Sequence, residues 1–334
     1  MNLINKKIAT RESFGNALVE LGKSNKDVIA LTADLAGATK TSLFAKQFPE
    51  RFINVGIAEQ NMMGIASGLA SCGKIPFVST FAMFAAGRAY DQIRNGIAYP
   101  NLNVKICATH SGITVGEDGA THQMLEDLSL MRTIPNMTVI STSDDTQTKW
   151  AINEMAKIDG PVYLRLARVA TPIIYNENEK FEIGKMVQIG EGVDATVFAT
   201  GVMVSEAIKA QEELAKENVN IRVIDVHTIK PIDTEMVIKC AKETKKIITI
   251  EDHSIIGGLG STICEVLSEN YPCKVIRMGM RDEFGKSGKA VELVKYFKLG
   301  YENIIEKIKN WCKGDFNRPF FVEVTKRYKL YIVL

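Results

Sequence analysis

The chain has 334 residues, of which 46% are hydrophobic and 24% are charged, and its formal net charge is +2. This length is enough for two domains, and the composition is typical of a soluble globular protein. The charge offers no basic excess for binding nucleic acid or a membrane surface. No apolar run reaches the ~18 residues that cross a bilayer, and the N-terminal stretch lacks the apolar core of a signal peptide. We therefore expect neither a nucleic acid nor a membrane as partner.

The cysteines and histidines give no sign of a disulfide framework or a metal centre. The six cysteines are scattered without a CxxC pair, which favours free thiols in a reducing compartment and predicts a cytoplasmic protein. The four histidines show no ligand spacing to these cysteines, so no metal site is expected on this chain. The cysteines are Cys72, Cys107, Cys240, Cys264, Cys273 and Cys312.

Helices and strands alternate through the first half of the chain. Residues 11–23 place Phe14, Ala17, Leu18 and Leu21 on one face of a helix. The elements that follow are strands at 28–33 and 52–57, a helix from Glu59, a strand at 76–80, a helix at 83–98, strands at 104–109 and 136–142, a helix at 144–158 and a strand at 161–167. The helix at 144–158 begins with a capping Asp. Short strands that alternate with helices predict βαβ units around a parallel sheet.

This pattern breaks at residues 171–191, which are polar and contain Pro, Asn and Gly. A second alternation of strands and helices begins at Asp194, includes a helix at 234–244 and continues to Trp311. We therefore expect an α/β protein with two doubly wound domains and mostly parallel sheets. The predicted boundaries are 1–175 for the first domain, 176–190 for a linker, 191–311 for the second domain and 312–334 for a tail of unknown origin.

Three residues that follow predicted strands are candidates for a ligand site. Glu59 comes after the strand at 52–57, and Phe81 and Phe84 come after the strand at 76–80. Ligands of open α/β sheets sit at the carboxyl ends of strands, and a carboxyl group in apolar surroundings can exchange protons near neutral pH. The alternative is structural, because a Glu in the first turn of a helix complements its dipole.

The segment after the strand at 104–109 is a second candidate. His110, Glu117, Asp118 and His122 lie within thirteen residues that also contain three glycines. Neutral histidines can move protons and hydrogen-bond sugar hydroxyls, and glycines let a ligand approach the backbone closely. A solvated surface loop with capping acids is the alternative interpretation.

The stretch from residue 52 to residue 84 resembles the pyrimidine-binding domain of transketolase, a thiamine-diphosphate enzyme. The family's G-[IV]-x-E motif is matched by GIAE at residues 56–59, and its T-F-x-x-F segment by TFAMF at residues 80–84. The resemblance implies that Glu59 hydrogen-bonds and protonates N1′ of the cofactor's aminopyrimidine. Phe84 would stack on that ring with Phe81 as its neighbour, and Asp34 matches a family position near the thiazolium.

The loop carries further motifs of the same family. THSG at residues 109–112 and GEDGATHQ at residues 116–123 are similar to its T-H-x-S/G and G-E-D-G-x-T-H-Q sequences. The resemblance implies that His110 and His122 contact the sugar substrate and take part in catalysis, and that Asp118 binds a hydroxyl near the reacting carbon. Arg11 and Arg168 match the two arginines that bind the substrate phosphate, for which a guanidinium fork is suited.

Two positions depart from the family pattern. A serine that contacts phosphate in the family is replaced by Ala38, and the adjacent Thr39 is a candidate substitute. The third aromatic of the pyrimidine pocket is replaced by Gly87, so we expect this pocket to be more open on one side.

The diphosphate half of the cofactor site has no counterpart in the sequence. A diphosphate is held through Mg²⁺ and a helix N-terminus, and the family's G-D-G…N motif for this purpose is missing. The resemblance covers residues 1 to about 311 and begins where the family's diphosphate-binding domain ends. The resemblance therefore implies that this chain is the C-terminal subunit of a split transketolase. We expect it to associate with an N-terminal subunit that carries the Mg²⁺ site, and the two to form a heterotetramer.

The implied reaction transfers a two-carbon ketol unit from a ketose phosphate to an aldose phosphate, as in the pentose phosphate pathway. Three alternatives stay open. RAYDQ at residues 88–92 resembles a segment of deoxyxylulose-phosphate synthase, although that enzyme is normally one long chain. The β subunit of an α-keto acid dehydrogenase has the same two domains, but His110 and His122 argue against it. A non-catalytic scaffold half is the third.

The second domain offers one further motif. GGLG at residues 257–260 could form a phosphate-binding turn, but a lone glycine cluster is weak evidence. Tight packing of a strand against a helix, together with a role at a subunit interface, is the favoured interpretation. We expect His227 and His253 to be structural or interfacial.

Overall fold

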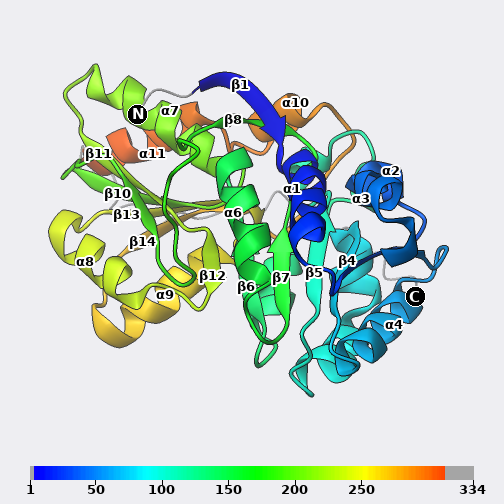
Figure 1. Cartoon of the computed structure of the whole chain (residues 1–334). Coiled ribbons are helices and arrows are strands. Elements are labelled where there is room, and N and C mark those ends of the chain that lie inside the picture. Colours follow the sequence, from blue (N-terminus) through cyan, green and yellow to red (C-terminus); the bar gives the residue numbers. More distant parts are fainter. Residues whose placement is uncertain (1–3, 313–334) are drawn as a thin grey trace, which may run out of the picture.

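The structure is a computed structural model that describes residues 4–312. It contains two large sheets side by side (Figure 1). The first has seven strands in the order β12-β6-β7-β5-β4-β2-β3. Their bounds are β12 Thr228–Lys230, β6 Thr138–Ser141, β7 Val162–Arg165, β5 Lys105–Thr109, β4 Ile75–Phe81, β2 Val28–Thr32 and β3 Phe52–Asn54. All pairings in this sheet are parallel except that of β12 with β6, which confirms the predicted fold class.

The helices of the first half cover both faces of this sheet. Apolar residues of α1, α3 and α6 pack on one face, and those of α4, α5 and the two π-helical segments η2 and η3 pack on the other. Burial of these apolar faces is the main stabilising contribution to the fold. The bounds are α1 Thr10–Ser24, α2 Ala36–Thr39, α3 Ser42–Gln47, η1 Pro49–Arg51, α4 Glu59–Ser71, η2 Met83–Arg88, η3 Gln92–Ala98, η4 Ile113–Val115, α5 Asp127–Arg132 and α6 Asp145–Met155.

The second sheet has five strands in the order β14-β13-β10-β11-β9, and only β9 is antiparallel to its neighbour. The strands are β14 Val275–Met280, β13 Ile247–Ser254, β10 Ala195–Ala199, β11 Ile221–Asp225 and β9 Val187–Ile189. The helices are α7 Met203–Ala215, α8 Thr234–Thr244, α9 Leu259–Asn270, α10 Ala290–Tyr296 and α11 Tyr301–Cys312. Within residues 4–312, no helix is both long enough and apolar enough to cross a membrane.

Several elements differ from the sequence-based expectations. The predicted linker 176–190 contains β9, an edge strand of the second sheet, and β12 belongs to the first sheet although it lies within the predicted second domain. Each has three residues, too few for a period-two pattern to be recognised. A further pair, β1 (Ile4–Ala9) and β8 (Ala170–Ile173), forms a two-stranded antiparallel sheet.

Two predicted elements of the first half were wrong in their extent or type. The strand predicted at 52–57 ends at Asn54, because Gly56 adopts a positive φ of 73° and turns the chain toward α4. The helix predicted at 83–98 consists of η2 and η3, since periodicity over so short a run does not separate an α-helix from π-helical turns. Of the predicted tail at 312–334, only Cys312 lies within the described residues.

Candidate active site

The parallel register of β4 and β5 brings two predicted site segments together. Phe81, the last residue of β4, pairs with Thr109, the last residue of β5, so His110 follows directly beside it. The Phe81 and His110 rings stack with their centroids 3.8 Å apart. Phe84 stacks on Phe81 at 5.7 Å, and His122 meets Phe84 edge-on at 5.6 Å. We call Phe81, Phe84, His110 and His122 the aromatic cluster.

Glu59 is the first residue of α4 and is only 3% exposed. Its Oε2 accepts a hydrogen bond of 2.8 Å from Nη1 of Arg88, whose guanidinium carbon lies 4.6 Å from the centroid of the Phe84 ring. Arg88 therefore joins the carboxylate to the aromatic cluster. The motif comparison did not single out Arg88 as a site residue. A signal was available, because a buried carboxylate requires a partner.

His110 is held in a defined orientation and tautomer. Nη1 of Arg11 lies 3.2 Å from Nε2 of His110, and Oγ1 of Thr109 lies 2.9 Å from Nδ1. Arginine can only donate, so Nε2 accepts and the proton of the neutral ring is on Nδ1. Burial, assisted by the positive charges of Arg11 and Arg168, lowers the pKa of His110 to about 3. The imidazole is therefore neutral at neutral pH.

The two predicted phosphate-binding arginines contact different residues of the loop. Arg11 also donates to the carbonyl oxygen of Ala38 at 3.0 Å, and its buried Nε has no hydrogen-bond partner among the described residues. Arg168 pairs with Glu117 at 3.1 Å and lies 3.9 Å from Oδ2 of Asp118. The structure thus brings Arg168 and Asp118, predicted from separate motifs, into one ion-pair group.

Asp34 lies at the carboxyl end of β2 and is exposed, and its amide donates to Oδ1 of Asn54 at 3.0 Å. This contact joins it to β3 rather than to the aromatic cluster. Thr39, the candidate substitute for the missing serine, is fully buried, and its hydroxyl lies 3.0 Å from both the Leu35 carbonyl and Thr41 Oγ1. The hydroxyl of Thr39 therefore serves internal contacts, and its role as a substitute for the serine stays a prediction.

A methionine side chain lies beside Gly87, and the more open pocket expected there stays a prediction. An added Cβ at Gly87 would lie 2.9 Å from Cε of Met83, so the methionine side chain lies directly against this glycine. Methionine is flexible and suited to filling irregular gaps of this kind.

Gln123 closes the loop and was not recognised as important from the sequence. Its Nε2 donates to the carbonyl oxygens of Ile113 at 3.2 Å and Gly116 at 3.1 Å within the loop, and to that of Lys286 at 2.8 Å in the second domain. The contact with Lys286 depends on a segment 163 residues away in sequence, which no local pattern shows.

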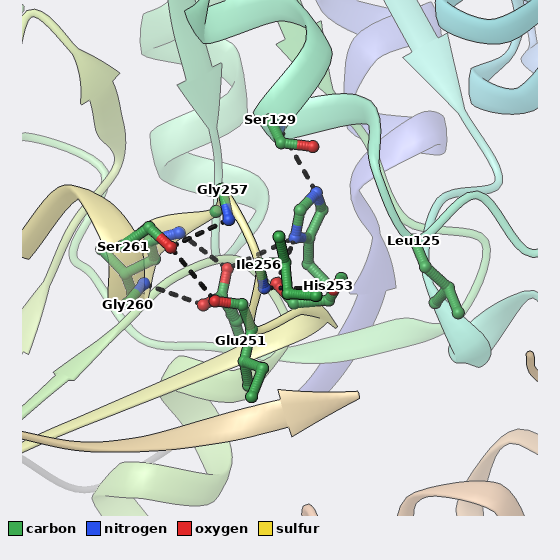
Figure 2. A network of polar contacts seen from close by, with 12 residues as sticks. Leu125, Ser129, Glu251, His253, Ile256, Gly257, Gly260 and Ser261 are labelled. Carbon is green, nitrogen blue, oxygen red and sulfur yellow. Dashed lines mark hydrogen bonds and ion pairs between the residues drawn. The ribbon is translucent and has the colours of Figure 1, made fainter. Parts of the chain in front are cut away.

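The glycine cluster at residues 257–260 is not a phosphate site (Figure 2). The carboxylate of Glu251 points at the N-terminus of α9 and accepts hydrogen bonds from the amides of Leu259 at 2.7 Å and Gly260 at 2.8 Å. A Cβ at Gly258 would lie 2.1 Å from Oε2 of Glu251, so close packing of strand and helix requires glycine there. The packing part of the favoured interpretation is confirmed, and the role at a subunit interface stays a prediction. Burial raises the pKa of Glu251 to about 7.

His253 and His227 are both fully buried, as expected of structural residues. Figure 2 shows the His253 ring directed at Ser129, whose amide donates to Nε2 at 3.4 Å. Burial lowers the pKa of each histidine to about 4. Among residues 4–312, no three His, Cys, Asp or Glu side chains come together as a metal site.

Comparisons with known proteins match both halves of the chain to one family. Residues 6–173 match the transketolase pyrimidine-binding domain, and residues 184–304 match the transketolase C-terminal domain. A solved structure described as "Split gene transketolase, inactive beta4 tetramer" superposes with a TM-score of 0.84 at 47% identity, covering 91% of this chain and 98% of that one.

Relatives of the same length and of twice the length are both found. The "Putative transketolase C-terminal section" of Methanocaldococcus jannaschii is 52% identical and covers 91% of this chain and 96% of that protein. The 6-deoxy-6-sulfo-D-fructose transketolase subunit of a Clostridium species is 43% identical over 88% of this chain and 92% of its own length. Human transketolase is 39% identical over 91% of this chain, which corresponds to 49% of its length.

Proposed function

The chain belongs to the transketolase family, and on this premise we propose that it is one subunit of a thiamine-diphosphate-dependent transketolase that transfers a two-carbon ketol unit between sugar phosphates. The observation that carries the proposal is that Glu59 and the aromatic cluster lie together at the carboxyl ends of parallel strands. Arg88 pairs with Glu59, and Arg11 contacts His110 of the cluster. We also propose that the protein is cytoplasmic and acts in the pentose phosphate pathway.

The need for a second subunit is supported by the half-length relatives. The chain corresponds to about half of human transketolase, and the split-gene β4 tetramer is described as inactive. We propose that a separate subunit carries the diphosphate and Mg²⁺ site and that the two form a heterotetramer.

The residues present fit the pyrimidine half of the family's cofactor. The buried Glu59 carboxylate beside the Phe84 ring offers a hydrogen-bond acceptor and an aromatic face, which an aminopyrimidine requires. Arg88 contacts both groups in this structure, so its guanidinium would move aside for the ring. Bound thiamine diphosphate supplies the nucleophilic carbon that takes up the two-carbon unit.

The chain's own residues would bind, orient and transfer protons. Glu59 would exchange a proton with N1′ of the pyrimidine. His110, kept neutral by burial and by Arg11, would offer a hydrogen-bonding ring to substrate hydroxyls, and His122 would do so from the end of the loop. Arg11 and Arg168 would bind the anionic end of the sugar, since guanidinium groups form strong charge-assisted hydrogen bonds with phosphate.

The identity of the donor sugar is a separate part of the proposal. The names of two half-length relatives specify 6-deoxy-6-sulfo-D-fructose and apulose-4-phosphate as their sugars. We propose a ketose phosphate donor and an aldose phosphate acceptor for this chain. Transfer assays with pentose phosphates, a sulfo-sugar and a branched sugar phosphate would distinguish these substrates.

The decisive experiment purifies this chain with its partner from source cells and measures native mass and ketol transfer. We expect a second chain and transfer activity that requires it. Glu59→Ala should reduce transfer at least about hundredfold, as loss of an acid–base group does, while Glu20→Ala on the exposed face of α1 should not. A correctly folded Glu59→Ala complex with near-normal turnover, or an active homo-oligomer without a second chain, would contradict the proposal.

A further inference from the structure

Successive side chains of β13 point to opposite faces of the strand and contact two different regions of the molecule. Glu251 and His253 face α9 and α5, whereas Asp252, between them, faces the loop of residues 110–123. We propose that Asp252 is a positioning residue that holds this loop in its binding conformation and so sets the affinity of the site for its sugar substrate. The substrate part of this inference rests on the proposed function; the structural part does not.

The Asp252 carboxylate is buried and bonded almost entirely to the beginning of the loop. Oδ1 accepts from the amide of Ile113 at 2.8 Å. Oδ2 accepts from the hydroxyl of Thr114 at 2.7 Å and from its amide at 3.3 Å. Asp252 is 1% exposed, so these hydrogen bonds are protected from competition by water.

The same carboxylate lies against Gly112. A Cβ added there would be 2.2 Å from Oδ2 of Asp252, and Gly112 has a positive φ of 74°. His110, two residues earlier, also has a positive φ, of 55°, which is unfavourable for a residue with a side chain. Such a conformation persists when its surroundings determine it. Asp252 holds the chain at residues 112–114, two to four residues after His110, and so supports the backbone conformation that orients that ring.

The end of the loop is held by the same strand. The amide of Ser254 donates to the carbonyl oxygen of Leu125 at 2.8 Å, and the amide of Gly112 donates to that of Met124 at 2.9 Å. The two ends of the loop are therefore joined to each other and to β13. His110 and His122 lie between these anchor points.

Asp252 is itself held by a buried ion pair. Nη2 of Arg165 donates to the Asp252 carbonyl oxygen at 2.8 Å, and Nε of Arg165 pairs with Asp127 at 2.8 Å. Both ion-pair partners are buried, so the backbone of Asp252 has little freedom to move. Asp252, a residue of the second domain, thus supports a site that the sequence motifs place wholly in the first domain.

The first test is amide hydrogen exchange in the full-length chain, read by mass spectrometry on peptides covering residues 111–116. Asn at position 252 keeps the size of the side chain but places an NH₂ group against donors. We expect Asp252→Asn to accelerate exchange of the Ile113 and Thr114 amides at least about tenfold. Asp225→Asn is the matched control, because Asp225 is a buried acceptor for Tyr175, Ser143 and Gln147 away from the loop.

A second pair of variants covers the case in which Asp252→Asn does not fold. Thr114→Val removes the hydroxyl bond to Oδ2 and keeps the shape, whereas Thr114→Ser keeps the hydroxyl. We expect faster exchange at residues 113–114 for the valine variant and near wild-type exchange for the serine variant. Wild-type exchange in the folded Asp252→Asn variant, or, if that does not fold, in Thr114→Val, would overturn the inference.

The third readout uses the assembled enzyme with its partner subunit. We expect Asp252→Asn or Thr114→Val to raise KM for the sugar donor about tenfold, as displaced binding groups do, with unchanged affinity for thiamine diphosphate. Equal losses for Asp225→Asn would indicate a general stability effect and contradict positioning. If wild-type enzyme transfers no ketol unit, the proposed function fails, while the exchange data still decide whether Asp252 holds the loop.

Discussion

Buried ionisable side chains that carry no charge are a feature of this protein at the residue scale. Burial lowers the pKa values of His110, His227 and His253 to between about 3 and about 4. His227 is the simplest of them, because burial alone causes its shift. Its ring lies edge-on to Trp150 at 4.9 Å, and its Nε2 has no hydrogen-bond partner among the described residues. Each such histidine couples protonation to unfolding.

The first prediction concerns His227 and acid stability. The unfolded histidine binds a proton near pH 6.5 and the folded one only near pH 4, so the unfolded state binds more protons between these values and stability decreases as the pH falls. We expect His227→Phe to reduce this dependence by up to about 1.4 kcal/mol per pH unit. Urea unfolding at several pH values in this window measures it.

The control for this prediction is Thr228→Val, which removes the hydroxyl 2.9 Å from Nδ1 of His227 and leaves the titrating ring in place. It should change stability by a similar amount at each pH. An unchanged pH dependence in His227→Phe would show that His227 does not contribute to acid unfolding.

At the scale of single elements, helix α6 illustrates how a local signal acquires a tertiary role. The sequence predicted an Asp cap, and Oδ1 of Asp144 does accept from the amide of Gln147 at 2.8 Å. The other oxygen, Oδ2, accepts from the amides of Ile174 at 2.8 Å and Tyr175 at 3.0 Å, which follow β8. One carboxylate therefore begins a helix and also anchors the chain as it leaves the first domain.

The second prediction follows from this double role. Asp144→Ala should reduce the free energy of unfolding by about 3 kcal/mol or more, because the loss of a cap and of acceptors for two further buried amides adds up. Asp233 caps α8 with bonds to the amides of Met236 at 3.1 Å and Met186 at 3.2 Å. Asp233→Ala should cost less, because it leaves fewer donors unsatisfied. Chemical denaturation measures both, and equal losses would refute the tertiary role of Asp144.

At the scale of the whole molecule, the two sheets are joined by more than a linker. Strand β12 crosses from the second half to pair with β6 of the first sheet. Asp225 at the end of β11 accepts from the Tyr175 hydroxyl at 2.7 Å and from Ser143 at 2.8 Å. Arg165 and Asp252 provide a second buried connection. Separating the halves would leave these groups unsatisfied, at a cost of about 1–3 kcal/mol for each neutral group.

The third prediction is therefore cooperative unfolding of the chain as one unit. The two tryptophans report on different halves, since Trp150 is in α6 and Trp311 is in α11. Single-tryptophan variants, Trp150→Phe and Trp311→Phe, should show fluorescence midpoints in denaturant that coincide with the far-ultraviolet circular dichroism midpoint of the same variant. Separate transitions within either variant would show that the halves unfold independently.

Most of the features that could be predicted from the sequence alone rest on residues that are adjacent in the chain. Glu59, the TFAMF segment at residues 80–84 and the loop at residues 109–123 are local motifs, and each follows a strand that its apolar run predicts. Parallel strands end at one edge, so the meeting of Phe81 with His110 followed from the fold class. The bounds of α8 at 234–244 agree with the prediction, because a capping Asp and a regular apolar face mark them.

Tertiary structure alone decided the contacts between distant segments. The pairing of Glu59 with Arg88, the closure of the loop by Gln123, and the position of Asp252 against Thr114 depend on side chains that the folded chain brings together. Strand β12 shows the same limit, since three residues carry too little pattern to choose between two sheets. A periodic pattern reports which face of an element is buried but not which partner covers it. The support for the loop therefore emerged only from the folded structure.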